Sequence, residues 1–432
     1  MKLTGWGRYP RIDACCYSFE SGKYLQKCLE KKGTFISYGL GRSYGDSALN
    51  NQVILTRRFN KILDFNEESG IVTCESGVSL AGLISAFLSR GWFLSVTPGT
   101  KFVTIGGAIA SDVHGKNHHK AGCFSSCVKS LELMLPDGNI VQCSKEKNRE
   151  LFLSTCGGMG LTGVIVSAEI QLRKTESAYI DQKIVKARNL EEIFKYFEQY
   201  ADWTYSVAWI DCLAKGNDLG RSILMIGEHA DDGFLHLPRN KKLSVPLEFP
   251  GFALNKHTVS LFNWLYFNKV RKNIIDNQTT IDSFFYPLDA VHNWNRIYGK
   301  NGFTQYQLVL PKEKSFEGLS RILNKISESG LGSFLAVLKL FGPENDNYLS
   351  FPLEGYTLAL DFKIEPRLFP LLDALDNIVL EYGGRIYLSK DVRLSQEVIE
   401  QGYPRINNFR AVRKQYGLEN KLRSRQSVRL GI

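Results

Sequence analysis

Three glycine-rich stretches in the first part of the chain constrain its fold more than any other feature. They occupy residues 38–46, 98–115 and 157–163. Glycine lets the backbone come close to a ligand, and successive backbone N–H groups in such turns form a concave site for an anion. One stretch of this kind is usually an ordinary turn. Three in one N-terminal segment, two of them with basic residues in or beside them, predict a wall that binds a cofactor with a diphosphate group.

The middle stretch leads into the run His114-Gly-Lys-Asn-His-His119, which holds three of the seven histidines. Titratable side chains beside a cofactor wall indicate that chemistry takes place close to the cofactor. Cys123 and Cys127 follow, but no second pair of Cys or His stands at the spacing of a zinc site. We therefore expect no metal site. The nine cysteines, an odd number, indicate free thiols in a reducing cytoplasm.

The last stretch contains Gly158-x-Gly160-x-x-Gly163, which has the spacing of the dinucleotide-binding fingerprint. That fingerprint needs a strand before it and a helix after it. Residues 164–172 are β-branched and partly alternating, and they predict a strand instead. Without a helix N-terminus the diphosphate has no helix dipole to bind to. The pattern therefore disfavours a Rossmann fold.

Further motifs stand in order along essentially the whole chain. They are Gly5-Trp-Gly-Arg8, Gly39-Leu-Gly-Arg-Ser-Tyr-Gly-Asp46, Pro98-Gly-Thr100, His114-Gly-Lys-Asn-His-His119, Gly160-Leu-Thr-Gly163, Gln305-Tyr-Gln307, Leu338-Lys-Leu-Phe-Gly-Pro343, Leu349-Ser-Phe-Pro352, Tyr387-Leu-Ser-Lys-Asp391 and Tyr403-Pro-Arg405. On these motifs the chain resembles the vanillyl-alcohol-oxidase type of FAD-binding oxidoreductases. Within that type it is most similar to the decaprenylphosphoryl-β-D-ribose oxidases.

The length of 432 residues already favours two domains. The resemblance implies an α+β, two-domain PCMH-type FAD-binding fold. In that fold residues 1–178 form the FAD-binding domain, completed by the C-terminal segment 385–432. Residues 179–384 form the substrate-binding domain, an antiparallel sheet with helices.

Local signals predict individual elements within this frame. Ser79 caps a helix that ends at Gly91, and Pro136-Asp-Gly138 turns a hairpin. Asn189 caps a second helix over residues 190–200. Further helices are predicted at 315–329 and 366–382, and strands at 304–310, 334–340 and 357–362.

The resemblance also implies which residues hold the cofactor, FAD. They are Gly39, Gly41, Arg42, Ser43, Tyr44, Gly45, Gly99, Thr104, Gly106, Gly107, His114, Gly115, Asn117, His118 and Ile165, with Tyr387 near the flavin ring. Some relatives attach the flavin covalently through a histidine in the first glycine-rich loop. Tyr44 stands at that position here, which is typical of the members with non-covalent FAD.

Lys390 is the strongest catalytic candidate because it follows Tyr387 at the end of an apolar strand. Desolvation there would lower the pKa of its amine, so that it could act as a base or bind the substrate; the alternative is a surface ion pair with Asp391. Lys339 and His114 are the other catalytic candidates, and Lys339 is unusual in being flanked by apolar strand residues.

Gln305 and Gln307 share one strand face and can reach one pocket. Together with Phe285, Lys339 and Lys390 they are the predicted substrate-binding residues. Mycobacterial members of the family carry Tyr at the position of Phe285 and Cys at the position of Ala359, so the pocket wall is altered here.

The activity that the resemblance implies is FAD-dependent oxidation of a polyprenyl-phosphate-linked pentose. Its C2 hydroxyl becomes a ketone, which is the first half of a ribose-to-arabinose epimerisation, and a separate short-chain NAD(P)H-dependent reductase completes it. Two alternatives stay open: an FAD-dependent oxidase of a soluble polyol or sugar lactone, and a non-enzymatic basic lipid-binding module.

The formal net charge of +10 is compatible with several partners. No nucleic-acid-binding motif is present, so nucleic acid is not an expected partner. Anionic lipid or a phosphorylated substrate would explain the charge, as would a mildly basic solvated surface.

Residues 238–280 place aromatic side chains among lysines and arginines. This pattern suits a membrane interface or a cover for a lipid tail, and it equally suits a buried amphipathic element. No apolar run is long enough to span a bilayer, and no apolar signal-peptide core follows Met1. We therefore expect a cytoplasmic protein that binds peripherally to the inner membrane.

Overall fold

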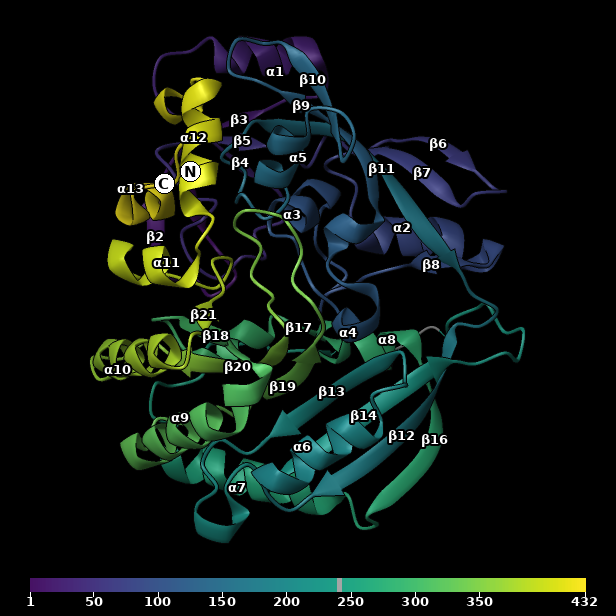
Figure 1. Cartoon of the computed structure of the whole chain (residues 1–432), viewed down its shortest axis with the longest axis vertical. Helices are drawn as coiled ribbons and strands as arrows, with labels where there is room; N and C mark the ends of the chain where they lie inside the picture. The colour runs from purple at the N-terminus through teal and green to yellow at the C-terminus, as the bar shows by residue number, and fades with distance from the viewer. Residues whose placement is uncertain (239–242) are drawn as a thin grey trace.

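The computed structural model describes residues 1–238 and 243–432. The basic residues 239–242, which open the predicted segment 238–280, lie outside the described residues. The fold is built around two main sheets, which occupy the upper and lower halves of Figure 1. The predicted α+β architecture is confirmed, whereas the boundaries at 178 and 384 stay a prediction.

The first main sheet is antiparallel and lies in the upper half. Its strands are β6 (Ile62–Asn66), β7 (Ile71–Glu75), β8 (Trp92–Leu94), β9 (Val128–Met134), β10 (Ile140–Ser144) and β11 (Val164–Lys174). The predicted hairpin is β9 with β10, and the predicted strand after Gly163 is β11. A strand and not a helix follows Gly163, so the glycine spacing of the dinucleotide fingerprint is present without the structure that the fingerprint requires.

Short elements surround this sheet. The strands are β1 (Lys2–Thr4) and β2 (Arg11–Asp13), which pair with each other, and β3 (Cys15–Ser18), β4 (Ile36–Tyr38) and β5 (Gln52–Leu55), which form a parallel sheet. The helices are α1 (Gly22–Leu29), α2 (Leu80–Phe87), α3 (Ile105–Ala110), α4 (His118–Ala121) and α5 (Arg149–Thr155). Ser79 caps α2 as predicted, by accepting a hydrogen bond from Gly82 N, and Gly91 ends the turn that follows with φ +79°.

The second main sheet has eight antiparallel strands. In spatial order they are β16 (Ile274–Thr280), β12 (Tyr179–Ala187), β14 (Ser222–His229), β13 (Tyr205–Ile210), β19 (Ala336–Phe341), β20 (Gly355–Lys363), β18 (Phe303–Pro311) and β21 (Arg385–Ile386). One face of this sheet packs against α6 (Leu190–Gln199), α9 (Ser315–Ser329) and α10 (Leu368–Glu381). Helix α10 begins at Leu368, two residues after the predicted start of the 366–382 helix.

The opposite face of the second sheet is turned toward the first half of the molecule. Helix α8 (Ile281–Phe285) lies at this side, and α7 (Lys256–Lys269) packs on Trp209 and Ile223 of the sheet through Tyr266 and Phe267. The remaining strands, β15 (Leu243–Ser244) and β17 (Val291–His292), form a small parallel pair nearby.

After β21 the chain returns to the N-terminal half, where Figure 1 shows the yellow helices beside the purple strands. These helices are α11 (Gln396–Gly402), α12 (Ile406–Gln415) and α13 (Arg425–Leu430). The connection is made by backbone pairing, because Phe35 N donates to Lys421 O at 2.7 Å and Arg423 N donates to Phe35 O at 3.0 Å. The last segment therefore adds to the wall that the glycine-rich loops form.

Candidate active site

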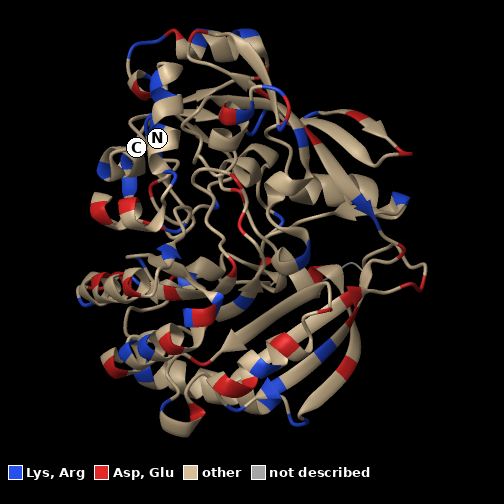
Figure 2. Cartoon of the chain, in the orientation of Figure 1, with Lys and Arg blue, Asp and Glu red and all other residues tan. Residues whose placement is uncertain are grey.

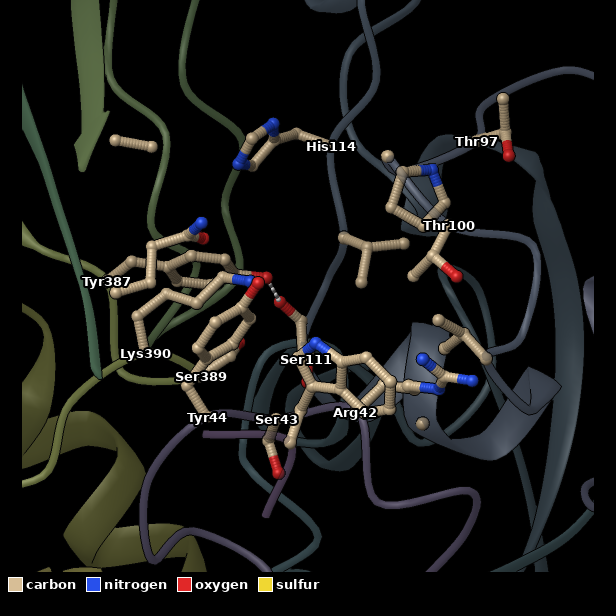
Figure 3. A pocket seen from close by; sticks show the side chains of 18 of the residues that line it. Arg42, Ser43, Tyr44, Thr97, Thr100, Ser111, His114, Tyr387, Ser389 and Lys390 are labelled. Atoms are coloured by element: carbon tan, nitrogen blue, oxygen red, sulfur yellow. Dashed lines mark hydrogen bonds between the residues drawn. The ribbon is translucent and has the colours of Figure 1, made fainter. Parts of the chain in front are cut away.

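A cavity of about 500 Å³ lies between the glycine-rich loops and the open face of the eight-stranded sheet. Figure 3 shows side chains from both halves of the chain pointing into it. The sheet contributes alternate residues, as its two-residue period requires. They are Val207 and Trp209 from β13, Gln305 and Gln307 from β18, Val337 and Lys339 from β19, and Thr357 and Ala359 from β20.

The glycine-rich loops are packed too tightly for side chains at several positions. A Cβ on Gly39 would lie 2.5 Å from Thr104 Oγ1, the atom that accepts a hydrogen bond from Gly107 N and caps α3. A Cβ on Gly106 would lie 3.1 Å from Ser76 Cβ. At these glycines the wall is therefore formed by backbone, which can come close to a ligand.

Three buried hydroxyls on the cavity wall have no hydrogen-bond partner among the described residues. They belong to Ser37, Ser76 and Ser389. An unsatisfied buried hydroxyl is costly, and a bound polar cofactor would satisfy it. The close-packed backbone of the glycine-rich loops, the volume of the cavity and the three unsatisfied hydroxyls together fit a bound flavin with its diphosphate.

Most predicted cofactor residues line this cavity. They are Gly39, Gly41, Arg42, Ser43, Tyr44, Gly99, Thr104, Gly106, Gly107, His114, Ile165 and Tyr387. The Arg42 guanidinium lies 3.9 Å from the centre of the Trp6 ring, and the Tyr387 hydroxyl donates to Ser111 O at 2.8 Å. These contacts hold both side chains in place at the wall.

The other four predicted cofactor residues lie behind the wall. A Cβ on Gly45 would lie 1.7 Å from Asp391 O, so Gly45 allows the C-terminal segment to approach. Gly115 packs closely against Thr97 O, and Asn117 Nδ2 donates to Ser95 O at 2.9 Å. His118 Nδ1 accepts from Gly342 N at 3.1 Å. These residues support the loops without facing the cavity.

Three lysines face the cavity from three different segments: Lys116, Lys339 and Lys390. Within the described part of the chain, none of them lies within 4.0 Å of a carboxylate. Desolvation lowers the pKa of the Lys116 amine to about 7 and that of Lys339 to about 8. Burial also lowers the pKa of Lys390, whose Nζ lies 4.1 Å from the centre of the Tyr44 ring.

Lys390 does not lie at the end of an apolar strand, contrary to the prediction. β21 pairs only through Arg385 and Ile386 with β18, after which Lys390 N donates to Tyr387 O at 3.0 Å and closes a turn. The alternative of an ion pair with Asp391 is also wrong, because Asp391 Oδ2 lies 2.8 Å from Arg429 Nη2. The turn directs Lys390 toward Tyr44 and Tyr387, as Figure 3 shows.

His114 and the two glutamines form a polar row on the sheet side. Gln307 Nε2 lies 3.0 Å from His114 Nε2 and 3.2 Å from Thr357 Oγ1. Burial and the nearby Lys339 hold the pKa of His114 well below its usual value, so its ring is neutral and accepts from the Gln307 amide. Gln305 Nε2 donates to Asp361 Oδ1 at 2.6 Å. Phe285 lines the cavity between Phe284 and Pro287.

Sequence reasoning missed several residues of this site. Lys116 was part of a recognised motif but was not assigned a role, and Trp6 and Ser389 were not singled out. Asp361 was missed although it stands in the apolar strand sequence Thr357-Leu-Ala-Leu-Asp-Phe362. The signal that marked Lys339, a charge flanked by apolar strand residues, marks Asp361 equally well.

Comparison with known proteins gives a consistent result. Residues 21–144 match the family model described as an FAD binding domain. The chain is 36% identical to decaprenylphosphoryl-β-D-ribose oxidase from Mycolicibacterium smegmatis, over 100% of this chain and 97% of that protein. It is 28% identical to an uncharacterised Streptomyces coelicolor protein over 82% of this chain and 100% of that one.

Another relative matches only about a third of the chain. Δ(24)-sterol reductase from Rattus norvegicus is 32% identical over 136 residues, which are 32% of this chain and 26% of that protein. The full-length match, the FAD binding domain and the cavity wall agree with the resemblance predicted from the sequence motifs. The chain therefore belongs to the decaprenylphosphoryl-β-D-ribose oxidase family and is an FAD-dependent oxidoreductase.

Proposed function

We propose that this protein oxidises the C2 hydroxyl of a polyprenyl-phosphate-linked ribose to a ketone. The observation that carries the proposal is one cavity that joins the cofactor wall to three lysines, none of which has a carboxylate within 4.0 Å among the described residues. Oxidation of a soluble polyol would give these lysines no anion to bind. The printed name of the full-length relative, an oxidase of decaprenylphosphoryl-β-D-ribose, supports this substrate class.

The cluster of lysines favours an anionic substrate on electrostatic grounds. Desolvation lowers the pKa of both Lys116 and Lys390, and the charge of Lys339 lowers each of them further, so Lys339 repels both amines. A phosphate between Lys116 and Lys339 would relieve this repulsion and accept charge-assisted hydrogen bonds from both. We assign these two lysines to the substrate phosphate.

Lys390 is left for the reacting hydroxyl. Its lowered pKa gives it a neutral fraction near neutral pH, so its amine can accept the hydroxyl proton. Bound FAD supplies the redox chemistry by accepting the hydride from the same carbon, so that two electrons and two protons leave the carbinol in total. Gln305 and Gln307 hold the other sugar hydroxyls, and the neutral His114 holds Gln307.

Helix α7 links the cavity to the outside of the molecule. Its Tyr266 lines the cavity and lies 4.8 Å from the ring of Trp209, while Leu261, Trp264 and Leu265 are 52–59% exposed on the other side of the helix. Residues 238–280 were predicted to be either a membrane interface or a buried amphipathic element, and the two descriptions apply to different faces of α7. The outer face is suited to a lipid surface, beside the place where a prenyl chain would leave the cavity.

Charge along the chain supports contact with an anionic membrane at this face. Lys269, Arg271 and Lys272 follow the exposed apolar residues closely. Helix α9, by contrast, carries both signs of charge, Glu317, Arg321, Lys325 and Glu328, as Figure 2 shows. No helix in residues 1–238 or 243–432 has the length and apolar character needed to cross a bilayer. We propose peripheral binding to the inner membrane.

The ketone requires a second enzyme if the net result is epimerisation. We propose a separate short-chain NAD(P)H-dependent reductase, which would return a hydride to C2 from the opposite face of the sugar. The position of the ketone can be tested directly. Borodeuteride reduction of the product should give both ribose and arabinose with deuterium at C2, and deuterium at any other carbon would contradict the proposal.

The decisive test is anaerobic reduction of the holoenzyme. Farnesylphosphoryl-β-D-ribose should bleach the visible flavin band in a single turnover, whereas xylitol and a sugar lactone should not. Bleaching by xylitol or the lactone alone would identify a soluble-substrate oxidase. Purified protein without a flavin spectrum would favour the non-enzymatic lipid-binding alternative. Acid precipitation should release the FAD, because Tyr44 stands where covalent relatives have histidine.

A further inference from the structure

We propose that Asp361 is a positioning residue, which orients Gln305 toward the substrate and balances the charge of Lys390. Asp361 does not itself line the cavity. It would act through Gln305, which lies in β18, and through Lys390, which lies in the turn after β21. The inference rests on the proposed function, because it assigns Lys390 and Gln305 to the substrate. It adds a residue that neither the sequence motifs nor the comparisons single out.

The burial of Asp361 needs an explanation. It stands in β20 between Leu360 and Phe362 with 0% of its surface exposed. No lysine, arginine or histidine among the described residues lies within 4.0 Å of its carboxylate. Its only side-chain partners there are Gln305 Nε2, at 2.6 Å, and the Tyr298 hydroxyl, at 3.5 Å. A buried carboxylate without an ion pair costs several kcal/mol of stability, and such costs are concentrated at functional sites.

The hydrogen bond to Gln305 fixes the orientation of its amide. A carboxylate only accepts hydrogen bonds, so the NH₂ group must face Asp361. The amide oxygen, Oε1, is then left without a partner among the described residues, on a side chain that lines the cavity. Gln305 is thereby prepared as an acceptor for a sugar hydroxyl. Gln307 differs, because its NH₂ group is held by His114 and Thr357 instead.

The second role is electrostatic. Four titratable groups surround Asp361: Lys390 from the turn after β21, Tyr298, Tyr44, and, beyond Lys390, Lys339. Burial raises the pKa of Asp361 and lowers that of Lys390, and each charge favours the other. Asp361 therefore opposes the effect of burial on Lys390, and its removal lowers the pKa of Lys390 further.

The sign of the expected pH effect follows from this coupling. Lys390 acts as a base only when it is neutral, so the rate of flavin reduction rises with pH through the pKa of Lys390. Without the charge of Asp361 that pKa is lower. The acid limb of the rate profile should then move to lower pH, by about one unit or more.

Two substitutions separate the two roles. Asp361→Asn keeps an acceptor for Gln305 and removes the charge, so it should shift the acid limb with little change in KM for farnesylphosphoryl-β-D-ribose. Asp361→Ala removes both, so it should shift the acid limb and also raise KM several-fold, and Gln305→Met should raise KM to a similar extent. Asp361→Glu keeps the charge and should leave the acid limb where wild type has it.

Asp376→Asn is the matched control. Asp376 is also buried and bonded to β18, since the Tyr306 hydroxyl donates to its Oδ1 at 2.9 Å, but on the helix side of the sheet. It should lower the melting temperature and leave both the acid limb and KM unchanged. An acid limb of Asp361→Asn that superimposes on wild type would overturn the electrostatic role, and an unchanged KM in Asp361→Ala would overturn the orienting role.

A measurement without turnover keeps the inference independent of substrate identity. Melting temperatures of Asp361→Asn, Lys390→Met and the double variant, all without FAD, form a double-mutant cycle. The loss in the double variant should be smaller than the sum of the two single losses, because each single variant leaves one buried charge unbalanced. Additive losses would contradict the coupling. Failure of wild type to oxidise the sugar would refute the proposed function and leave this result standing.

Discussion

At the scale of single residues, Lys390 is the proposed base that accepts the hydroxyl proton, and the variant Lys390→Ala tests this role. Single-turnover flavin reduction should slow by roughly 10²–10⁴, while FAD content stays normal because the backbone wall is untouched. Lys390→Arg should be equally slow, because arginine keeps the charge and cannot become neutral near pH 7. A reduction rate within a few-fold of wild type would move the base assignment to Lys339 or His114.

The lowered pKa of Lys116 predicts how the stability of the fold depends on pH. Its pKa is about 7 in the fold against 10.5 for the ordinary amine, so between those values the unfolded chain binds more protons and stability rises with pH. Lys116→Met removes this term. The melting temperature of wild type, relative to that of Lys116→Met, should therefore rise from about pH 7 to about pH 10. Parallel curves for the two proteins, measured by scanning fluorimetry without FAD, would contradict the lowered pKa.

How far the site could be predicted depends on whether its signal is local. Lys339 and Lys390 stand out because each is a charge within an apolar stretch, and the glycine loops are visible as composition. The contact of Gln305 with Asp361 is not local, since the two lie 56 positions apart and meet only because β18 pairs with β20. The sequence alone contains no rule that fixes this register.

At the scale of secondary structure, the outer face of α7 predicts membrane binding. Trp264→Ser with Leu265→Ser should reduce flotation with phosphatidylglycerol-containing vesicles by roughly tenfold or more, because each side chain would bury its apolar surface in the bilayer. Flavin content and melting temperature should stay near wild type. KM for the farnesyl substrate should rise.

Two other variants separate surface from packing. Phe316→Ser removes an exposed aromatic side chain from α9 and should leave flotation unchanged. Phe267→Ser removes a ring that packs with Trp209 and Ile223, so it should lower the melting temperature. Unchanged flotation of the α7 double variant would show that this face does not bind lipid.

Helices and strands were predictable where their ends carry their own signals. Asn189 caps α6 by accepting from Glu192 N, and Gly330 ends α9 in the left-handed region with φ +71°. Helix α10 begins at Leu368 and not at the predicted Pro366, because Pro366 and Arg367 form a turn before it. Strand β21 ends at Ile386, before Lys390, because its length depends on how far β18 can pair, which is a property of the sheet.

At the scale of the whole molecule, Arg429 ties the C-terminal segment to the cofactor wall. Its Nη2 lies 2.8 Å from Asp46 Oδ1 in the first glycine-rich stretch and 2.8 Å from Asp391 Oδ2. Arg429→Ala would leave two buried carboxylates without a cation, which should lower the free energy of unfolding by about 3 kcal/mol and weaken FAD retention.

The control for this prediction is Arg410→Ala, which breaks a partly exposed pair with Glu400 in the same C-terminal segment. It should change the denaturation midpoint only slightly and leave FAD content unchanged. Equal losses in the two variants would mean that Arg429 contributes no more than a surface charge.

The return of the chain to Phe35 also determines when the flavin can first be held. A ribosome completes residues 38–163 long before it makes Tyr387, Ser389 and Lys390, which line the same cavity, and Arg429, which ties the C-terminal segment to Asp46. A nascent or prematurely terminated chain therefore has most of the loops but cannot close them around FAD. The amount of protein-bound flavin in a cell extract would then report only the full-length chains. Truncated chains would stay colourless and open to proteolysis.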